Sequence, residues 1–184
     1  MKRVYVLVEG ASDAAFLRRI LPEQALSSAE LVVAGGSSGI PSLARSVLVR
    51  RKSPVAVVMD SDSVDPDVIE ERQQSIEDLI RAADASVPVK IVSAIPAIEA
   101  WFFAAPETIE RTIGQKVSAE LLSLGKRDPR GVLRQLAENN NKSWNTDEAI
   151  SALDDHDIER IRTIPEVAEL STFLQEVLKP NHVH

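Results

Sequence analysis

The chain has 184 residues, which is long enough for one domain with a sizeable hydrophobic core. It contains no cysteine, which excludes disulfides and thiolate metal sites. A net charge of −7 argues against a protein that coats nucleic acid through charge alone, and 4% aromatic residues argue against a base-stacking platform. No signal peptide or stretch of transmembrane length is visible, so we expect a cytoplasmic protein with no membrane partner.

The first hundred residues alternate strands and helices. Strands are expected at residues 3–8, 30–34, 54–59 and 88–95, and helices near 12–21, 41–51 and 65–83. Runs of β-branched residues predict strands buried on both faces, as in a parallel sheet with helices on each side. Beyond Pro96 the pattern becomes an apolar helical segment followed by several short helices. We therefore predict an α/β domain over residues 1–100, with a mostly parallel four-stranded sheet flanked by helices, and an all-helical extension over residues 101–184 packed on it.

Acidic residues follow the first and third expected strands. Glu9 comes directly after Val4–Val8, and Asp60 and Asp62 come after Val55–Met59. Ligands of such sheets bind outside the carboxyl ends of the strands, and residues i and i+2 of an extended segment point the same way. Close carboxylates repel each other unless protons or cations neutralise them, and Mg²⁺ prefers oxygen ligands. The sequence therefore predicts a magnesium site at this edge of the sheet.

Three further residues are candidates at the same edge. Asp13, in the first turn of the next helix, is expected to lean back toward Glu9, although first-turn acids also stabilise helices on their own. Gly10 suits a tight turn, either a plain one or one that a ligand approaches closely. Glu99, just past the fourth strand, is either a further ligand or supporting acid, or a solvated side chain.

Candidate phosphate-binding groups are weaker in the sequence. Gly35 and Gly36 begin a glycine-rich loop whose N–H groups are able to cradle a phosphate, although it is not a P-loop and a flexible strand-to-helix turn is the favoured explanation. Two basic clusters are candidates for holding a nucleic-acid backbone. The first contains Arg45, Arg50, Arg51 and Lys52, and the second contains Lys126, Arg127, Arg130 and Arg134.

Over residues 3–100 the chain resembles a Toprim domain, the fold shared by topoisomerases, primases and OLD-type nucleases. The resemblance rests on the apolar run ending in Glu9–Gly10, on the Gly pair after the second strand, and on Val57–Asp62. The spacing of Glu9 and Asp13 is similar to the acidic pattern of the OLD-type nucleases. Residues 96–101 resemble a segment of small stand-alone Toprim-like proteins of bacteria, some of them linked to phage defence.

The resemblance implies roles for the acidic residues. Glu9 would be a metal ligand or general acid–base, Asp60 and Asp62 would bind Mg²⁺ or Mn²⁺, and Asp13 would help to hold a second ion. The implied activity is a metal-dependent nuclease, or a related phosphodiester-transfer protein acting on DNA or RNA, in phage defence or DNA repair. Catalysis would rest on Glu9, Asp60 and Asp62, supported by Glu99 and the glycines.

Other interpretations stay open. The sequence shows no lysine after the Gly pair or just past the fourth strand, which favours a non-catalytic Toprim-fold subunit that binds metal or nucleic acid in a larger complex or a homodimer. Receiver domains and dehalogenase-like phosphatases place their paired acids after the first strand, whereas Asp60 and Asp62 follow the third. A nucleotide-sugar transferase remains a further alternative.

Overall fold

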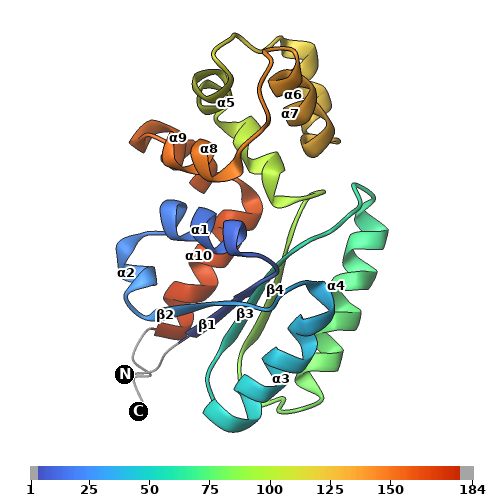
Figure 1. Cartoon of the computed structure of the whole chain (residues 1–184). Coiled ribbons are helices and arrows are strands. Elements are labelled where there is room, and N and C mark those ends of the chain that lie inside the picture. The colour runs from blue at the N-terminus through green and yellow to red at the C-terminus, as the bar shows by residue number, and fades with distance from the viewer. Residues whose placement is uncertain (1–3, 179–184) are drawn as a thin grey trace.

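A four-stranded parallel sheet forms the centre of the molecule in the computed structural model, which describes residues 4–178 (Figure 1). The strands are β1 (Val4–Val8), β2 (Ala29–Val33), β3 (Val55–Asp60) and β4 (Val89–Ala94), and they lie in the order β2-β1-β3-β4. Every neighbouring pair is parallel. The predicted α/β class is therefore confirmed, and all three pairings are parallel rather than most of them.

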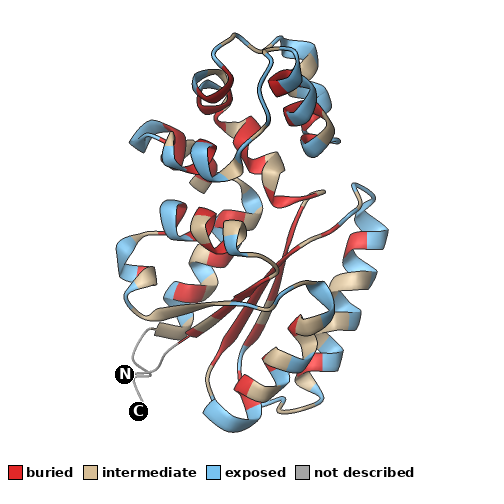
Figure 2. Cartoon of the chain, in the orientation of Figure 1, coloured by how far each residue is buried: buried red, intermediate tan, exposed pale blue. Residues whose placement is uncertain are grey.

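Helices cover both faces of this sheet (Figure 1). One face carries α3 (Ile40–Arg51) and α4 (Pro66–Arg81), and the other carries α1 (Ala11–Ile20), α2 (Glu23–Leu26) and α10 (Pro165–Leu178). The central strands β1 and β3 are accordingly almost fully buried, whereas the edge strand β2 is only half-buried (Figure 2). Because α10 packs against β4 and β1, this last helix of the described chain lies in the same layer as the first helix, α1.

The other helices gather beyond the ends of the strands (Figure 1). The chain leaves β4 through a 3₁₀ segment, η2, where an apolar helix was expected. Several of the helices that follow begin at a short polar side chain that accepts a backbone N–H, among them Ser118, Asp128 and Asp154. The elements of this part are η2 (Ile98–Ala104), α5 (Pro106–Ile113), α6 (Ala119–Gly125), α7 (Pro129–Glu138), α8 (Thr146–Ser151) and α9 (Asp155–Arg162). A short 3₁₀ turn, η1 (Ser37–Gly39), precedes α3.

One hydrophobic core joins the sheet to these C-terminal helices. Phe16 of α1 stacks on Phe102 of η2, with ring centroids 4.5 Å apart, and Phe102 meets the ring of Trp144 edge-on at 5.6 Å. The same cluster of buried side chains includes Val6 of β1 and Leu170 of α10. A second cluster fills the space between the sheet and α3 and α4. The position of the C-terminal helices is therefore fixed by shared apolar contacts.

Across residues 4–178, every helix is too short or too polar to span a bilayer.

Candidate functional site

The strand order creates a topological switch point between β1 and β3, which we call the crevice. From β1 the chain proceeds toward β2, and from β3 it proceeds toward β4, so the two connections diverge at the carboxyl edge of the sheet, where the strands end. Ligands of open α/β sheets bind at this kind of switch point. The structure brings Glu9 and Asp60 together there, and the backbone N–H of Asp60 donates to Glu9 Oε1 at 3.2 Å.

Asp60 is the most strongly perturbed acid of the crevice. Its side chain is only 15% exposed, and Oδ1 accepts a hydrogen bond from the N–H of Ile98 at 2.9 Å. Oδ2 forms an ion pair with Arg130 of α7. Burial raises the pKa of Asp60 to about 6, although the hydrogen bond from Ile98 and the charge of Arg130 act in the opposite direction. A carboxyl group perturbed in this way marks a candidate functional site.

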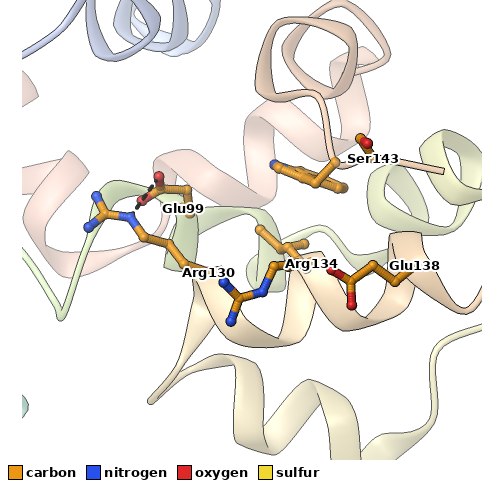
Figure 3. A pocket seen from close by; sticks show the side chains of 7 residues that line it. Glu99, Arg130, Arg134, Glu138 and Ser143 are labelled. Carbon is orange, nitrogen blue, oxygen red and sulfur yellow. Dashed lines mark hydrogen bonds and ion pairs between the residues drawn. The ribbon is translucent and has the colours of Figure 1, made fainter.

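Arg130 connects two acidic side chains. Besides its ion pair with Asp60, its Nε donates to Glu99 Oε1 at 3.0 Å, a contact visible in Figure 3. The other oxygen of Glu99, Oε2, is buried and has no hydrogen-bond partner within the described part of the chain. The two carboxylates raise the pKa of Arg130, which therefore stays charged. In the sequence Arg130 belongs to a basic cluster and not to the predicted site, because its partners lie 31 and 70 residues away.

Asp13 lies close to this group. Its Oδ2 accepts the N–H of Gly10 at 2.8 Å, which caps the start of α1. Burial raises the pKa of Asp13, and the carboxylate of Glu99 raises it further. The helix-stabilising role is therefore present, in a position where Asp13 also feels the charges of Glu99 and Arg130.

Asp62 does not point where the sequence suggested. The expectation that Asp60 and Asp62 share one extended segment is wrong, because β3 ends at Asp60 and Asp62 has a left-handed φ of 53°. Its carboxylate is 62% exposed and pairs with Arg72 Nη1 at 3.1 Å. The same Arg72 nitrogen donates to the carbonyl of Ser61 at 2.8 Å, so α4 holds this turn.

The glycine pair supports the backbone of the crevice rather than offering free donors. Gly35 and Gly36 have φ values of 75° and 122°, which glycine adopts readily. Their N–H groups both donate to the carbonyl oxygen of Glu9, at 3.1 and 3.0 Å. These two donors are therefore engaged, contrary to the phosphate cradle considered from the sequence, and they fix the point at which Glu9 leaves β1.

The first basic cluster lies at the other end of the sheet. Arg50, Arg51 and Lys52 end α3 and lead into the start of β3, so they are at the amino edge, away from Glu9. Lys52 pairs there with Asp84. Their role as phosphate-binding groups stays a prediction, but from the amino edge they do not act together with the acidic residues. The second cluster provides the cation at the carboxyl edge through Arg130.

The acidic residues have the ligand atoms that a divalent cation requires, but their side chains are not arranged around one point. Glu9, Asp13, Asp60 and Glu99 offer hard carboxylate oxygens, and buried Glu99 Oε2 has an unmet need for a partner. Within residues 4–178, however, no three acidic or histidine side chains are close enough together to hold a metal. Arg130 now supplies the positive charge between Asp60 and Glu99. The donor chemistry therefore fits Mg²⁺ or Mn²⁺ on condition that Arg130 moves away from Asp60.

A pocket of about 340 Å³ opens beside this ion-pair network (Figure 3). It is lined by Glu99, Arg130, Leu133, Arg134, Glu138, Ser143 and Trp144. Most of its wall comes from α7 and from the loop that leads to α8, and no pattern in the sequence connects these segments with the acidic motifs.

No protein-family model matches this chain, and no curated protein matches it. The structure is similar to the C-terminal region of the OLD protein of Xanthomonas campestris pv. campestris, at 17% identity, a TM-score of 0.48 and 95% coverage of each chain. It is also similar to the C-terminal region of the OLD protein of Burkholderia pseudomallei, at 16% identity and a TM-score of 0.48, over 95% of this chain and 99% of that one. Likeness of this degree identifies no residue of the site.

Proposed function

We propose that the protein is a divalent-cation-dependent phosphodiester hydrolase that acts on nucleic acid. The proposal rests on one observation above all. Glu9 and Asp60 are in contact at the switch point of a parallel sheet, and an arginine from α7 neutralises Asp60. Two neighbouring carboxylates that need a cation, next to a guanidinium able to bind phosphate, form the combination that phosphodiester hydrolysis requires. A setting in phage defence or DNA repair is part of the proposal through the Toprim resemblance alone.

Each residue has a defined task in this proposal. Glu9 and Asp60 hold the cation, and Asp13 and Glu99 add negative charge beside them. A bound Mg²⁺ or Mn²⁺ would supply an activated water and offset the charge that develops on the phosphate. Arg130, released from Asp60, stays anchored on Glu99 and turns its remaining N–H donors to a phosphate oxygen.

A second candidate function is a non-catalytic subunit that binds nucleic acid or a protein partner. The observation that favours it is the ion pair of Arg130 with Asp60, since a site closed in this way binds no cation. Asp62, which would be a ligand by resemblance, pairs with Arg72 instead. Such a subunit would bind nucleic acid equally well with and without Mn²⁺.

Calorimetry with Mn²⁺ and a cleavage assay on labelled single-stranded DNA and RNA test the proposal. We expect Mn²⁺ binding and cleavage in the unaltered protein, and loss of both in Glu9→Gln and Asp60→Asn. Glu70→Gln, which removes an exposed carboxylate of α4, is the matched control and should change neither. Absence of Mn²⁺ binding, or equal cleavage by Asp60→Asn and the unaltered protein, would rule the proposal out.

A further inference from the structure

The pocket beside the acidic residues shares two side chains with them. Glu99 and Arg130 line it and also belong to the network that includes Asp60. A ligand that fills this pocket therefore lies next to the crevice between β1 and β3. Its volume of about 340 Å³ is at the lower end of small-molecule sites, which span about 300–1,000 Å³, so it suits a single compact unit rather than a stacked series.

Charge is distributed unevenly along the α7 wall of the pocket. Arg130, Arg134 and Glu138 follow one another at intervals of four residues, so they lie on one face of the helix, as Figure 3 shows. Among the described residues Arg134 has neither a carboxylate partner nor a hydrogen bond. The uncommitted guanidinium thus lies toward the acidic residues, while Glu138 repels anions from the far end. An anionic group in this pocket is directed to Arg134.

An aromatic ring also lines the pocket. Trp144 is half-buried, its ring meets Phe102 edge-on, and its Nε1 donates to Thr146 Oγ1 at 3.2 Å. Leu133, which is buried, adds an apolar surface. An aromatic ring and an uncommitted arginine in one pocket match a planar base joined to a phosphate, because every base has a face that stacks on an aromatic side chain.

We infer that this pocket binds one unpaired nucleotide of a single strand, with its phosphate on Arg134 and its base against Trp144. The base must be unpaired, because a base inside a duplex is stacked on both faces and cannot enter a pocket. The low aromatic content agrees with one stacked base rather than several. The inference rests on the proposed function in one respect only: the next phosphate of the bound strand would lie beside Asp60.

Fluorescence of tryptophan offers a test that needs neither metal nor turnover. The chain has two tryptophans, and Trp101 is only 2% exposed, so a ligand in the pocket reports through Trp144. The probe is a 5′-phosphorylated tetrathymidylate, titrated in EDTA at several salt concentrations. We expect saturable quenching, about tenfold weaker binding by Arg134→Ala, and a salt slope reduced by about 0.7 in that variant, the contribution of one single-strand phosphate contact.

Two further variants make the test selective. Arg18→Ala removes the same charge from an exposed position of α1, outside the pocket and outside both basic clusters, and should leave affinity and salt slope nearly unchanged. Trp144→Leu should abolish the quenching, weaken binding about tenfold as measured by anisotropy of a labelled probe, and keep the salt slope. Unquenched wild-type fluorescence, or equal effects of Arg134→Ala and Arg18→Ala, would overturn the inference.

The test separates the inference from the proposed function. Quenching in EDTA without any Mn²⁺-dependent cleavage would support the pocket and refute the hydrolase. Cleavage that is unaffected by Arg134→Ala, with no quenching by the probe, would support the hydrolase and refute the pocket.

Discussion

Arg130 of α7 forms an ion pair with Asp60, the last residue of β3, across 70 residues of sequence. The pair lies at the carboxyl edge, beside the contact between Asp60 and Glu9. It gives a buried carboxylate a counter-charge and holds α7 against the crevice. The behaviour of the site thus depends on whether Arg130 stays on Asp60 or is displaced from it.

Replacement of Arg130 should separate metal binding from cleavage. In Arg130→Gln the competing cation is gone from Asp60 and Glu99, so we expect Mn²⁺ affinity to rise about tenfold by calorimetry. Cleavage should fall at least about tenfold, because a charged phosphate contact is lost. Arg18→Gln, with the same charge change at an exposed position of α1 outside the site, is the control. An unchanged Mn²⁺ affinity in Arg130→Gln would contradict the competition.

Asp60 should impose a pH dependence on stability. Its pKa in the folded protein is about 6, above the ordinary value of 3.8, so the folded state binds this proton more tightly than the unfolded state does. The resulting stabilisation is present at low pH and is lost as the pH rises from about 4 to about 6. Between about pH 4 and about pH 7, the unaltered protein should lose about 1–2 kcal/mol of unfolding free energy relative to Asp60→Asn, after allowance for solvent screening.

Urea unfolding at a series of pH values measures this difference. Glu110→Gln provides a comparison of opposite sign, because hydrogen bonds from the N–H of Val117 and from Lys116 lower the pKa of Glu110. Relative to that variant, the unaltered protein should gain stability as the pH rises. Parallel curves for Asp60→Asn and the unaltered protein would show that Asp60 is not perturbed.

Gly125 should tolerate no side chain. A methyl group at this position, the last residue of α6, would lie 1.9 Å from Cε1 of the buried Phe103. Since Phe103 belongs to the packed segment η2, Gly125→Ala should lower the unfolding free energy by about 1–3 kcal/mol, as overpacking does. Ser123→Ala, an exposed change on the same helix, should change it by less than about 0.5 kcal/mol. Equal melting temperatures of the two variants would contradict this packing.

The first hundred residues should not fold alone. A chain that ends at residue 100 lacks Phe102, which stacks on Phe16, and lacks α10, which covers β4 and β1. Exposure of that apolar face should abolish cooperative unfolding as followed by circular dichroism, whereas the full chain should unfold in a single transition. A cooperative transition in the shortened chain would show that residues 1–100 form an independent domain.

Local patterns in the sequence predicted the elements well. The apolar run Val55–Met59 is the central buried strand that was expected, and the helix expected near residues 65–83 is α4, which Asp65 caps by accepting the N–H of Asp67. Pro129 and Pro165 begin helices, a position that proline favours. Each of these features depends on neighbours in the chain. The meeting of Glu9 and Asp60 followed from strand ends alone, because parallel strands align their carboxyl ends.

The remaining features depend on contacts between distant residues. Asp62 leaves the strand direction because a left-handed turn and Arg72 of α4 redirect it. The rule that residues i and i+2 of a strand point the same way takes neither of them into account. Arg130 reaches Asp60 only because α5 to α9 pack beyond the carboxyl edge, which the sequence of α7 does not encode by itself. The hydrophobic pattern indicated that the C-terminal helices pack on the sheet, but it did not indicate that α7 is the helix that brings an arginine to the site.

The ion pair between Arg130 and Asp60 also sets an order of events during synthesis. The acidic residues all belong to the first hundred residues, and the arginine that neutralises them emerges later. A nascent chain that has made β1 to β4 therefore exposes an edge with uncompensated negative charge and an uncovered apolar face. Both are removed only when α7 and α10 have left the ribosome, so the acidic crevice is electrostatically complete only in a protein whose two halves have both been made.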